Sequence, residues 1–101
     1  MIDYIIKHIE WSLKTFGYGH KYKALCKHIR KETMEIEQSP HDLTEWVDVI
    51  ILAIDGAWRA GHTPADILDA LEEKQRINMN RQWPENVQPG QPSEHIREPT
   101  P

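Results

Sequence analysis

Apolar residues recur along the chain at helical spacing, and no stretch alternates in the way that a half-buried strand does. The first such segment covers residues 3–15, with Asp3 placed to cap it. A loop with two glycines, residues 16–20, separates it from a second segment that runs from Tyr22 to about Gln38. This loop is either a simple turn between helices or a backbone that approaches a ligand closely.

The third segment is apolar on nearly every side. Between Trp46 and Trp58 its only charged residues are Asp48 and Asp55. A helix of this kind has to be covered on nearly every side, and three other short helices cannot do that within one chain. We therefore expect a homo-oligomer, either a dimer or a tetramer built as a dimer of dimers.

The fourth segment has a clear start and is followed by a change in composition. Thr63 and Pro64 are suited to the N-cap and the first helical position, and the apolar pattern continues to about Asn80. Prolines then interrupt the chain repeatedly. We predict an all-α fold, a four-helix bundle over residues 1–82, followed by an extended, proline-rich tail over residues 83–101.

Composition narrows the classes of function. Twelve basic and sixteen acidic residues give the 101-residue chain a formal net charge of −4 without any basic run, which argues against nucleic-acid binding. No apolar run approaches the roughly 18 residues of a transmembrane helix, and the chain does not open on a signal-peptide pattern. The single Cys26 excludes an internal disulfide and fits a reducing cytoplasm. We expect neither nucleic acid nor a membrane as a partner.

Two pairs of carboxylates stand on the second and third predicted helices. Glu32 and Glu35 form one pair and Glu45 and Asp48 the other, and residues three apart share one face of a helix. If the helices fold back on each other around Pro40, Glu35 meets Glu45 and Glu32 meets Asp48. Four crowded carboxylates repel one another unless a cation lies among them. Oxygen ligands of this kind suit Mg²⁺ or Mn²⁺.

Other interpretations of these acids remain open. Glu45 could complete a capping box with Asp42, the predicted N-cap of the third helix. The acids could also form a solvated face, or pair with lysine and arginine in a non-catalytic helical scaffold or regulatory oligomer. Asp48 argues against these, because an unpaired charge within an apolar helix is costly. A di-iron site would need Glu-x-x-His pairs, which neither acid pair provides.

Several further residues are placed to contact a substrate. Lys74, Asn78 and Arg81 form one stripe on the fourth helix, suited to phosphate oxygens. Acids that hold a metal, together with cations that hold anionic oxygens, indicate phosphoryl chemistry. His28 lies one turn before Glu32 and could reach a substrate, although an ordinary surface histidine is the alternative.

The end of the first helix is a second candidate for substrate contact. It carries Trp11, Thr15 and Phe16, which could stack on a nucleobase or hydrogen-bond to it. For Trp11 taken alone, packing in the core is the favoured interpretation.

The acidic motif resembles the signature of the all-α nucleoside triphosphate pyrophosphohydrolases of the MazG-like type, EExxE followed by ExxD. Here it stands as Lys31-Glu32-x-x-Glu35 and Glu45-x-x-Asp48, with Lys31 in place of the first Glu. The chain more closely resembles the phage and bacterial branch called dATP/dGTP diphosphohydrolase. That closer resemblance is carried by residues 11–17, 28–32, 45–50, 55–61 and 74–84.

The resemblance implies an activity and a fold. It implies a MazG-like four-helix domain that hydrolyses purine deoxynucleoside triphosphates, dGTP or dATP, to the monophosphate and pyrophosphate. It also implies the cytoplasm of a bacterium or of a phage-infected host as the location.

The resemblance further implies roles for individual residues. Mg²⁺ or Mn²⁺ would be held by Glu32, Glu35, Glu45 and Asp48. We ourselves predict that Glu35 and Glu32 are the catalytic residues, with Glu35 orienting the attacking water. The resemblance implies that Lys74, Asn78 and Arg81 hold phosphates and that the end of the first helix, with Trp11 and Thr15, lies near the base. We also expect Lys31 and His28 to contact the substrate.

Overall fold

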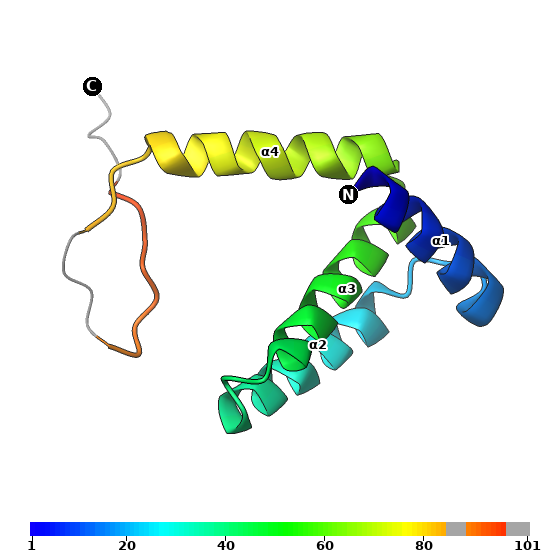
Figure 1. The fold of residues 1–101 in the computed structure, drawn as a ribbon, viewed down its shortest axis with the longest axis horizontal. Coiled ribbons are helices and arrows are strands. Elements are labelled where there is room, and N and C mark those ends of the chain that lie inside the picture. Colours follow the sequence, from blue (N-terminus) through cyan, green and yellow to red (C-terminus); the bar gives the residue numbers. More distant parts are fainter. Residues whose placement is uncertain (85–88, 97–101) are drawn as a thin grey trace. The chain divides into compact units, whose positions relative to one another are not determined.

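A computed structural model of the chain describes residues 1–84 and 89–96. Within these residues it contains four α-helices and no strand: α1 (Ile2–Phe16), α2 (Tyr22–Gln38), α3 (Leu43–Arg59) and α4 (Pro64–Asn80) (Figure 1). The predicted all-α class is therefore confirmed. The chain divides into two compact units, Met1–Leu68 and Asp69–Pro101.

The proline-rich segment predicted over residues 83–101 lies partly outside the described residues. Where it is described, its one regular feature is an isolated antiparallel bridge between Gln82 and Ile96. The amide nitrogen of Ile96 donates to the carbonyl oxygen of Gln82 at 2.6 Å. The extended tail, like the four-helix bundle, stays a prediction.

The helix ends follow local capping chemistry, with one correction. Oδ1 of Asp42 accepts from the amide of Thr44 at 3.0 Å, as expected of an N-cap. Thr63 and Asp66 form a reciprocal pair at the start of α4, because each side chain accepts from the other's backbone amide. The assignment of Asp3 as a cap is wrong: α1 begins two residues earlier, with Met1 as its N-cap. Asp3 lies in the first turn, where its negative charge interacts favourably with the helix dipole.

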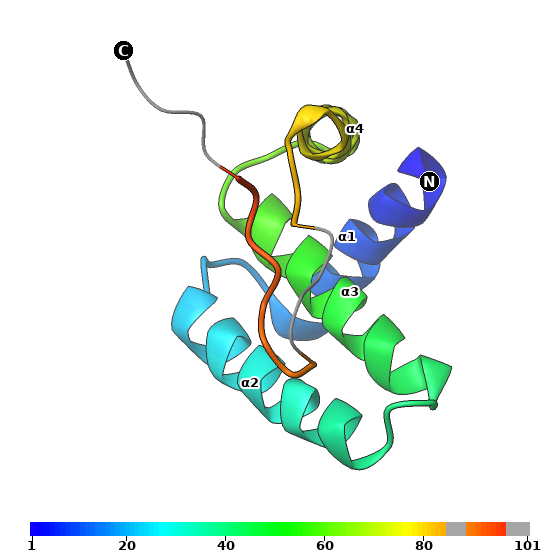
Figure 2. The same ribbon diagram turned by 90° about the vertical axis from the view of Figure 1, so that its left-hand side faces the viewer.

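α2 and α3 form an antiparallel hairpin, and both views show the two helices side by side (Figures 1 and 2). The turn at residues 39–42 is closed by a bond from the amide of Asp42 to the carbonyl of Ser39 at 3.1 Å. Nε1 of Trp46 donates to the carbonyl of Pro40 at 3.0 Å and ties the start of α3 to this turn. The predicted hairpin around Pro40 is confirmed.

Few apolar side chains are buried. Among the described residues, the buried apolar side chains are Ile5, Ile36 and Ile54. A stripe along the outside of α3 is exposed instead, and we call its four members, Leu43, Trp46, Val47 and Ile50, the outer stripe of α3. They recur at helical spacing, so they form one continuous apolar surface.

This exposed surface leads to the first prediction. We expect the chain to sediment as a dimer or tetramer at micromolar concentration, because a second copy would remove the outer stripe of α3 from water. Ile50→Asp should shift the protein toward the monomer in sedimentation equilibrium. A parent chain that is monomeric and active at this concentration would contradict the expectation.

Candidate functional site

The hairpin brings three of the four predicted acids together. Glu32 and Glu35 project from α2 and Glu45 from α3, and one carboxylate oxygen from each lies within 4.8 Å of the other two. We call these three residues the acidic cluster. Glu32 is buried, with 7 % of its surface exposed. Oε2 of Glu32 and Oε2 of Glu45 are both buried and have no hydrogen-bond partner within the described residues.

Mutual repulsion and burial perturb these carboxyl groups. Hydrogen bonding to Glu35, burial and the negative charges of Glu35 and Asp48 raise the pKa of Glu32, which a bond from His28 lowers only in part. Burial, followed by the hydrogen bond and charge of Glu35, raises the pKa of Glu45. Glu35 therefore interacts with both of its neighbours. The cluster holds more negative charge than its surroundings offset.

The position of Asp48 differs from the prediction that it is buried and meets the other three acids. It is exposed and does not belong to the acidic cluster, although its charge raises the pKa of Glu32 and Glu45. The argument that burial in an apolar helix makes its charge costly is therefore wrong for the single chain, because the side of α3 that carries it is open. The argument applies instead to Glu32 and Glu45, whose buried oxygens have no partner.

The capping-box interpretation of Glu45 does not match the contacts. In such a box the Glu45 carboxylate would accept from the backbone amide of Asp42. That amide donates to the carbonyl of Ser39 instead. A role for Glu45 outside helix capping is therefore the better explanation of its position.

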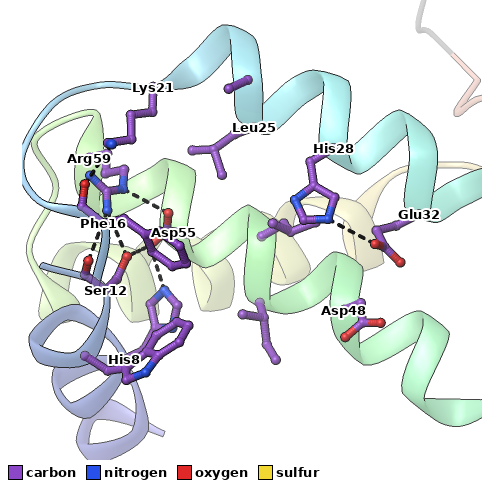
Figure 3. Close-up of a pocket in the computed structure, with 14 residues that line it drawn as sticks. His8, Ser12, Phe16, Lys21, Leu25, His28, Glu32, Asp48, Asp55 and Arg59 are labelled. Atoms are coloured by element: carbon purple, nitrogen blue, oxygen red, sulfur yellow. Dashed lines mark hydrogen bonds and ion pairs between the residues drawn. The ribbon is translucent and has the colours of Figure 1, made fainter. Parts of the chain in front are cut away.

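A pocket of about 520 Å³ extends from Glu32 along the space between α1, α2 and α3. Glu32 and Asp48 lie at one end of it, and Asp55 and Arg59 at the other (Figure 3). His28 lies between the two ends, and its Nε2 is 3.1 Å from Oε1 of Glu32. His28 therefore contacts Glu32 and also lines the pocket.

The far end of the pocket is built on a buried carboxylate. Asp55 accepts from Nε2 of His8 at 2.8 Å, Oγ of Ser12 at 2.6 Å, Nε1 of Trp58 at 2.8 Å and Nε of Arg59 at 2.9 Å. Burial raises the pKa of Asp55, but these hydrogen bonds outweigh it and hold the pKa at about 2. Asp55 is therefore a permanent anion that joins α1 to α3.

Arg59 extends this network into the loop between α1 and α2. Its Nη1 donates to the carbonyl oxygens of Gly17 at 2.8 Å and Gly19 at 3.1 Å, and its Nη2 donates to Oγ of Ser12 at 2.8 Å. Both glycines have positive φ, 77° and 121°, a conformation that other residues rarely adopt. The loop is thus held in a fixed path beside the pocket. We call Asp55, Arg59, Ser12 and His8 the buried network.

Aromatic side chains line the same end. Trp11 and Phe16 meet edge to face with ring centroids 5.5 Å apart, and both line the pocket. The assignment of Trp11 to the core is wrong, since 54 % of its surface is exposed. It is exposed because α1 packs on α3 through the buried network rather than through this side chain. Thr15 is exposed and does not line this pocket.

The remaining predicted substrate residues are not among those that line this pocket. Lys31 is exposed on α2, next to Glu32. Lys74, Asn78 and Arg81 belong to the second unit, where Nη1 of Arg81 donates to Oδ1 of Asn78 at 3.3 Å. Their contact with phosphates stays a prediction.

Sequence reasoning missed the buried network as a group. A signal was present, because Asp55 and Arg59 stand four residues apart on an otherwise apolar helix, as do His8 and Ser12 on α1. Nothing in the sequence indicated that these two pairs face each other. That pairing spans more than forty residues of chain and depends on how α1 packs against α3.

These features define an all-α protein with a carboxylate cluster whose member Glu32 lines one end of a partly aromatic pocket. The chain belongs to the dATP/dGTP pyrophosphohydrolase family, whose model matches residues 4–101. The resemblance seen in the sequence is thereby confirmed at the level of this family, a family of hydrolases.

One curated relative adds to this assignment. The chain is 42 % identical to the Eaa protein of Salmonella phage P22 over 93 residues, which are 91 % of this chain and 28 % of that protein. The chain thus spans less than a third of that relative's length. No solved structure matches the chain. None of the described helices is long and apolar enough to cross a membrane.

Proposed function

We propose that this chain hydrolyses purine deoxynucleoside triphosphates, dGTP or dATP, to the monophosphate and pyrophosphate in a reaction that depends on Mg²⁺ or Mn²⁺. One observation carries the proposal: Glu32, Glu35 and Glu45 converge, Glu32 and Glu45 each have a buried carboxylate oxygen without a partner among the described residues, and Glu32 lines the end of a pocket. Family membership supports the substrate class.

The acidic cluster fits a hard divalent cation. Its ligand atoms are all carboxylate oxygens, which Mg²⁺ and Mn²⁺ prefer. Hydrogen bonding to Glu35 for Glu32, and burial for Glu45, are the main causes of the raised pKa of these two groups, and the neighbouring negative charges add to both shifts. A bound cation would offset these negative charges. Glu32, Glu35 and Glu45 would hold the ion, with Asp48 completing the set from α3. When bound, the ion would supply positive charge against the phosphate oxygens and the attacking water.

The chain's own residues would orient the substrate and the water. Glu35, in the middle of the acidic cluster, is placed to accept a hydrogen bond from the attacking water and direct it. Glu32 is held in position by His28 at 3.1 Å. Trp11 and Phe16 offer aromatic surface on which a purine can stack at the far end. Lys31, Lys74, Asn78 and Arg81 are proposed to hold phosphates.

The rival proposal is a non-catalytic scaffold in which the acids pair with basic side chains. The described contacts do not favour it, because no lysine or arginine among the described residues forms an ion pair with the acidic cluster. The single ionic contact of Glu32 in that part of the chain is with His28.

The relative from phage P22 fits a role in a phage-infected cell.

Metal titration combined with product analysis tests the proposed function. We expect Mn²⁺ to bind with an increase in thermal stability, because the ion binds the folded acidic cluster and not the unfolded chain. With Mg²⁺ or Mn²⁺ present, dGTP and dATP should give monophosphate and pyrophosphate in equal amounts, and pyrimidine triphosphates should react far more slowly. A chain that binds neither ion and releases no pyrophosphate would favour the scaffold.

A further inference from the structure

We propose that Lys21 determines specificity by donating a hydrogen bond to the keto oxygen of guanine, so that dGTP is preferred to dATP. This inference rests on the proposed function. It concerns the end of the pocket that lies away from the acidic cluster, where the base of a bound nucleotide would lie.

Lys21 stands at the correct end of the pocket for a contact with the base. Figure 3 shows it beside Phe16 and Arg59, at the end opposite Glu32 and Asp48. Glu32 lies eleven residues further along the chain, which corresponds to about 16 Å along the axis of α2. A phosphate held at the acidic cluster is therefore out of reach of the Lys21 ammonium group.

The other polar groups at this end are already engaged. Asp55 accepts four hydrogen bonds, and Oγ of Ser12 both donates to Asp55 and accepts from Arg59. Arg59 uses Nε, Nη1 and Nη2 for bonds to Asp55, to two loop carbonyls and to Ser12. His8 is buried and directs Nε2 at Asp55. The buried network thus shapes the end of the pocket, but most of its hydrogen-bond donors and acceptors are already used and few are left to recognise a base.

Lys21, in contrast, has hydrogen-bond donors available for a base. Its ammonium group has three N–H donors. One of them donates a hydrogen bond to the carbonyl oxygen of Phe16 at 2.8 Å. The backbone of Lys21 is left-handed, with φ 53° and ψ 18°, a conformation that is costly for a residue with a side chain. Such conformations concentrate at ligand sites. The strained backbone and the bond to Phe16 together hold this ammonium group at the pocket wall.

The chemistry of an ammonium group distinguishes the two purines. Both purines carry an acceptor nitrogen at N7, but at the six-position guanine presents a keto oxygen and adenine presents an amino donor. Lysine only donates, so it bonds to the keto oxygen and finds another donor at the same place on adenine. Trp11 and Phe16 stack on either ring and do not distinguish them. Lys21 is therefore the group that selects guanine.

The test compares Lys21→Met with Lys23→Met, an exposed lysine on the same helix that does not line the pocket. The substrates are dGTP and dITP, which carry the keto oxygen, and dATP and the diaminopurine deoxynucleoside triphosphate, which carry an amino group there. We expect Lys21→Met to lower kcat/KM for the two keto substrates by about tenfold, the loss of one hydrogen bond from a charged group. The two amino substrates should change by less than about twofold, and Lys21→Arg should keep the preference.

Two results would overturn this inference. An equal loss for all four substrates would mean that Lys21 contacts phosphate or only fastens the end of α1. A parent chain that prefers dATP, or a Lys21→Met variant that keeps the preference for dGTP, would exclude the bond. Tryptophan fluorescence titration with dGTP and dATP measures binding without hydrolysis. A chain that binds dGTP selectively through Lys21 but releases no pyrophosphate would refute the proposed function and support this inference.

Discussion

Replacing Glu35 by glutamine is expected to reduce hydrolysis of dGTP and dATP by at least about a hundredfold, the loss typical of removing one electrostatic contribution at an active site. Glu35 interacts with both Glu32 and Glu45, so its carboxylate is the member of the acidic cluster that the others share. Glutamine keeps the shape and removes the charge. Without metal the variant should be at least as stable as the parent, because one repelling carboxylate is gone.

The matched control is Glu37→Gln. Glu37 is an exposed acid on the same helix, two residues along the chain and outside the acidic cluster. Pyrophosphate release should stay near the parental rate in this variant, and Mn²⁺ should still raise its melting temperature. Equal activity in Glu35→Gln and Glu37→Gln would show that the hairpin acids are not the active site.

Replacing Asp55 by alanine is expected to destabilise the fold by about 3–5 kcal/mol, the cost of leaving a buried charge without its partner. Arg59 is 5 % exposed, and its Nε bonds to Asp55 at 2.9 Å. Ser12, His8 and Trp58 lose the same acceptor. The measurement is urea unfolding followed by circular dichroism, with Asp69→Ala, an exposed acid on α4, as the control.

The pH dependence of unfolding provides a second measurement on the same variant. The pKa of Asp55 is about 2 in the folded chain and 3.8 as its usual value, so the folded state favours the ionised form. The resulting stability is fully present above pH 3.8 and is lost as the pH falls through about 2. Asp55→Ala should therefore show a weaker loss of stability in this acid range than the parent. Identical acid profiles for the two proteins would contradict the role given to Asp55.

Local chemistry made most of the first unit predictable. Pro40 and Asp42 mark the turn and the N-cap of α3, and the spacing of Glu32, Glu35 and Glu45 places them on facing sides of the hairpin. These signals act over a few residues, and a short connection between antiparallel helices leaves little freedom of register. The sequence therefore predicted correctly that Glu32, Glu35 and Glu45 meet, although Asp48, the fourth acid of that prediction, lies outside the acidic cluster.

Exposure was less predictable because it depends on how α1 packs. Trp11 and Asp48 were expected to be covered and are exposed, whereas Asp55 and Arg59 are buried. An apolar pattern identifies a face that needs cover but does not say whether the same chain or another copy provides it. The approach of Lys74 to the substrate likewise depends on an arrangement that local pattern does not determine.

The buried network also has a consequence for how this sequence can evolve. An apolar contact tolerates many volume-conserving exchanges, because methyl groups can repack around one another. The contact between α1 and α3 lacks that tolerance, because each hydrogen bond of Asp55, Arg59 and Ser12 satisfies a group that would otherwise be buried alone. A single substitution at one of these positions leaves the buried polar groups of its partners without a hydrogen bond. We therefore expect these positions to diverge among descendants only in concert, through rare paired replacements rather than by gradual drift.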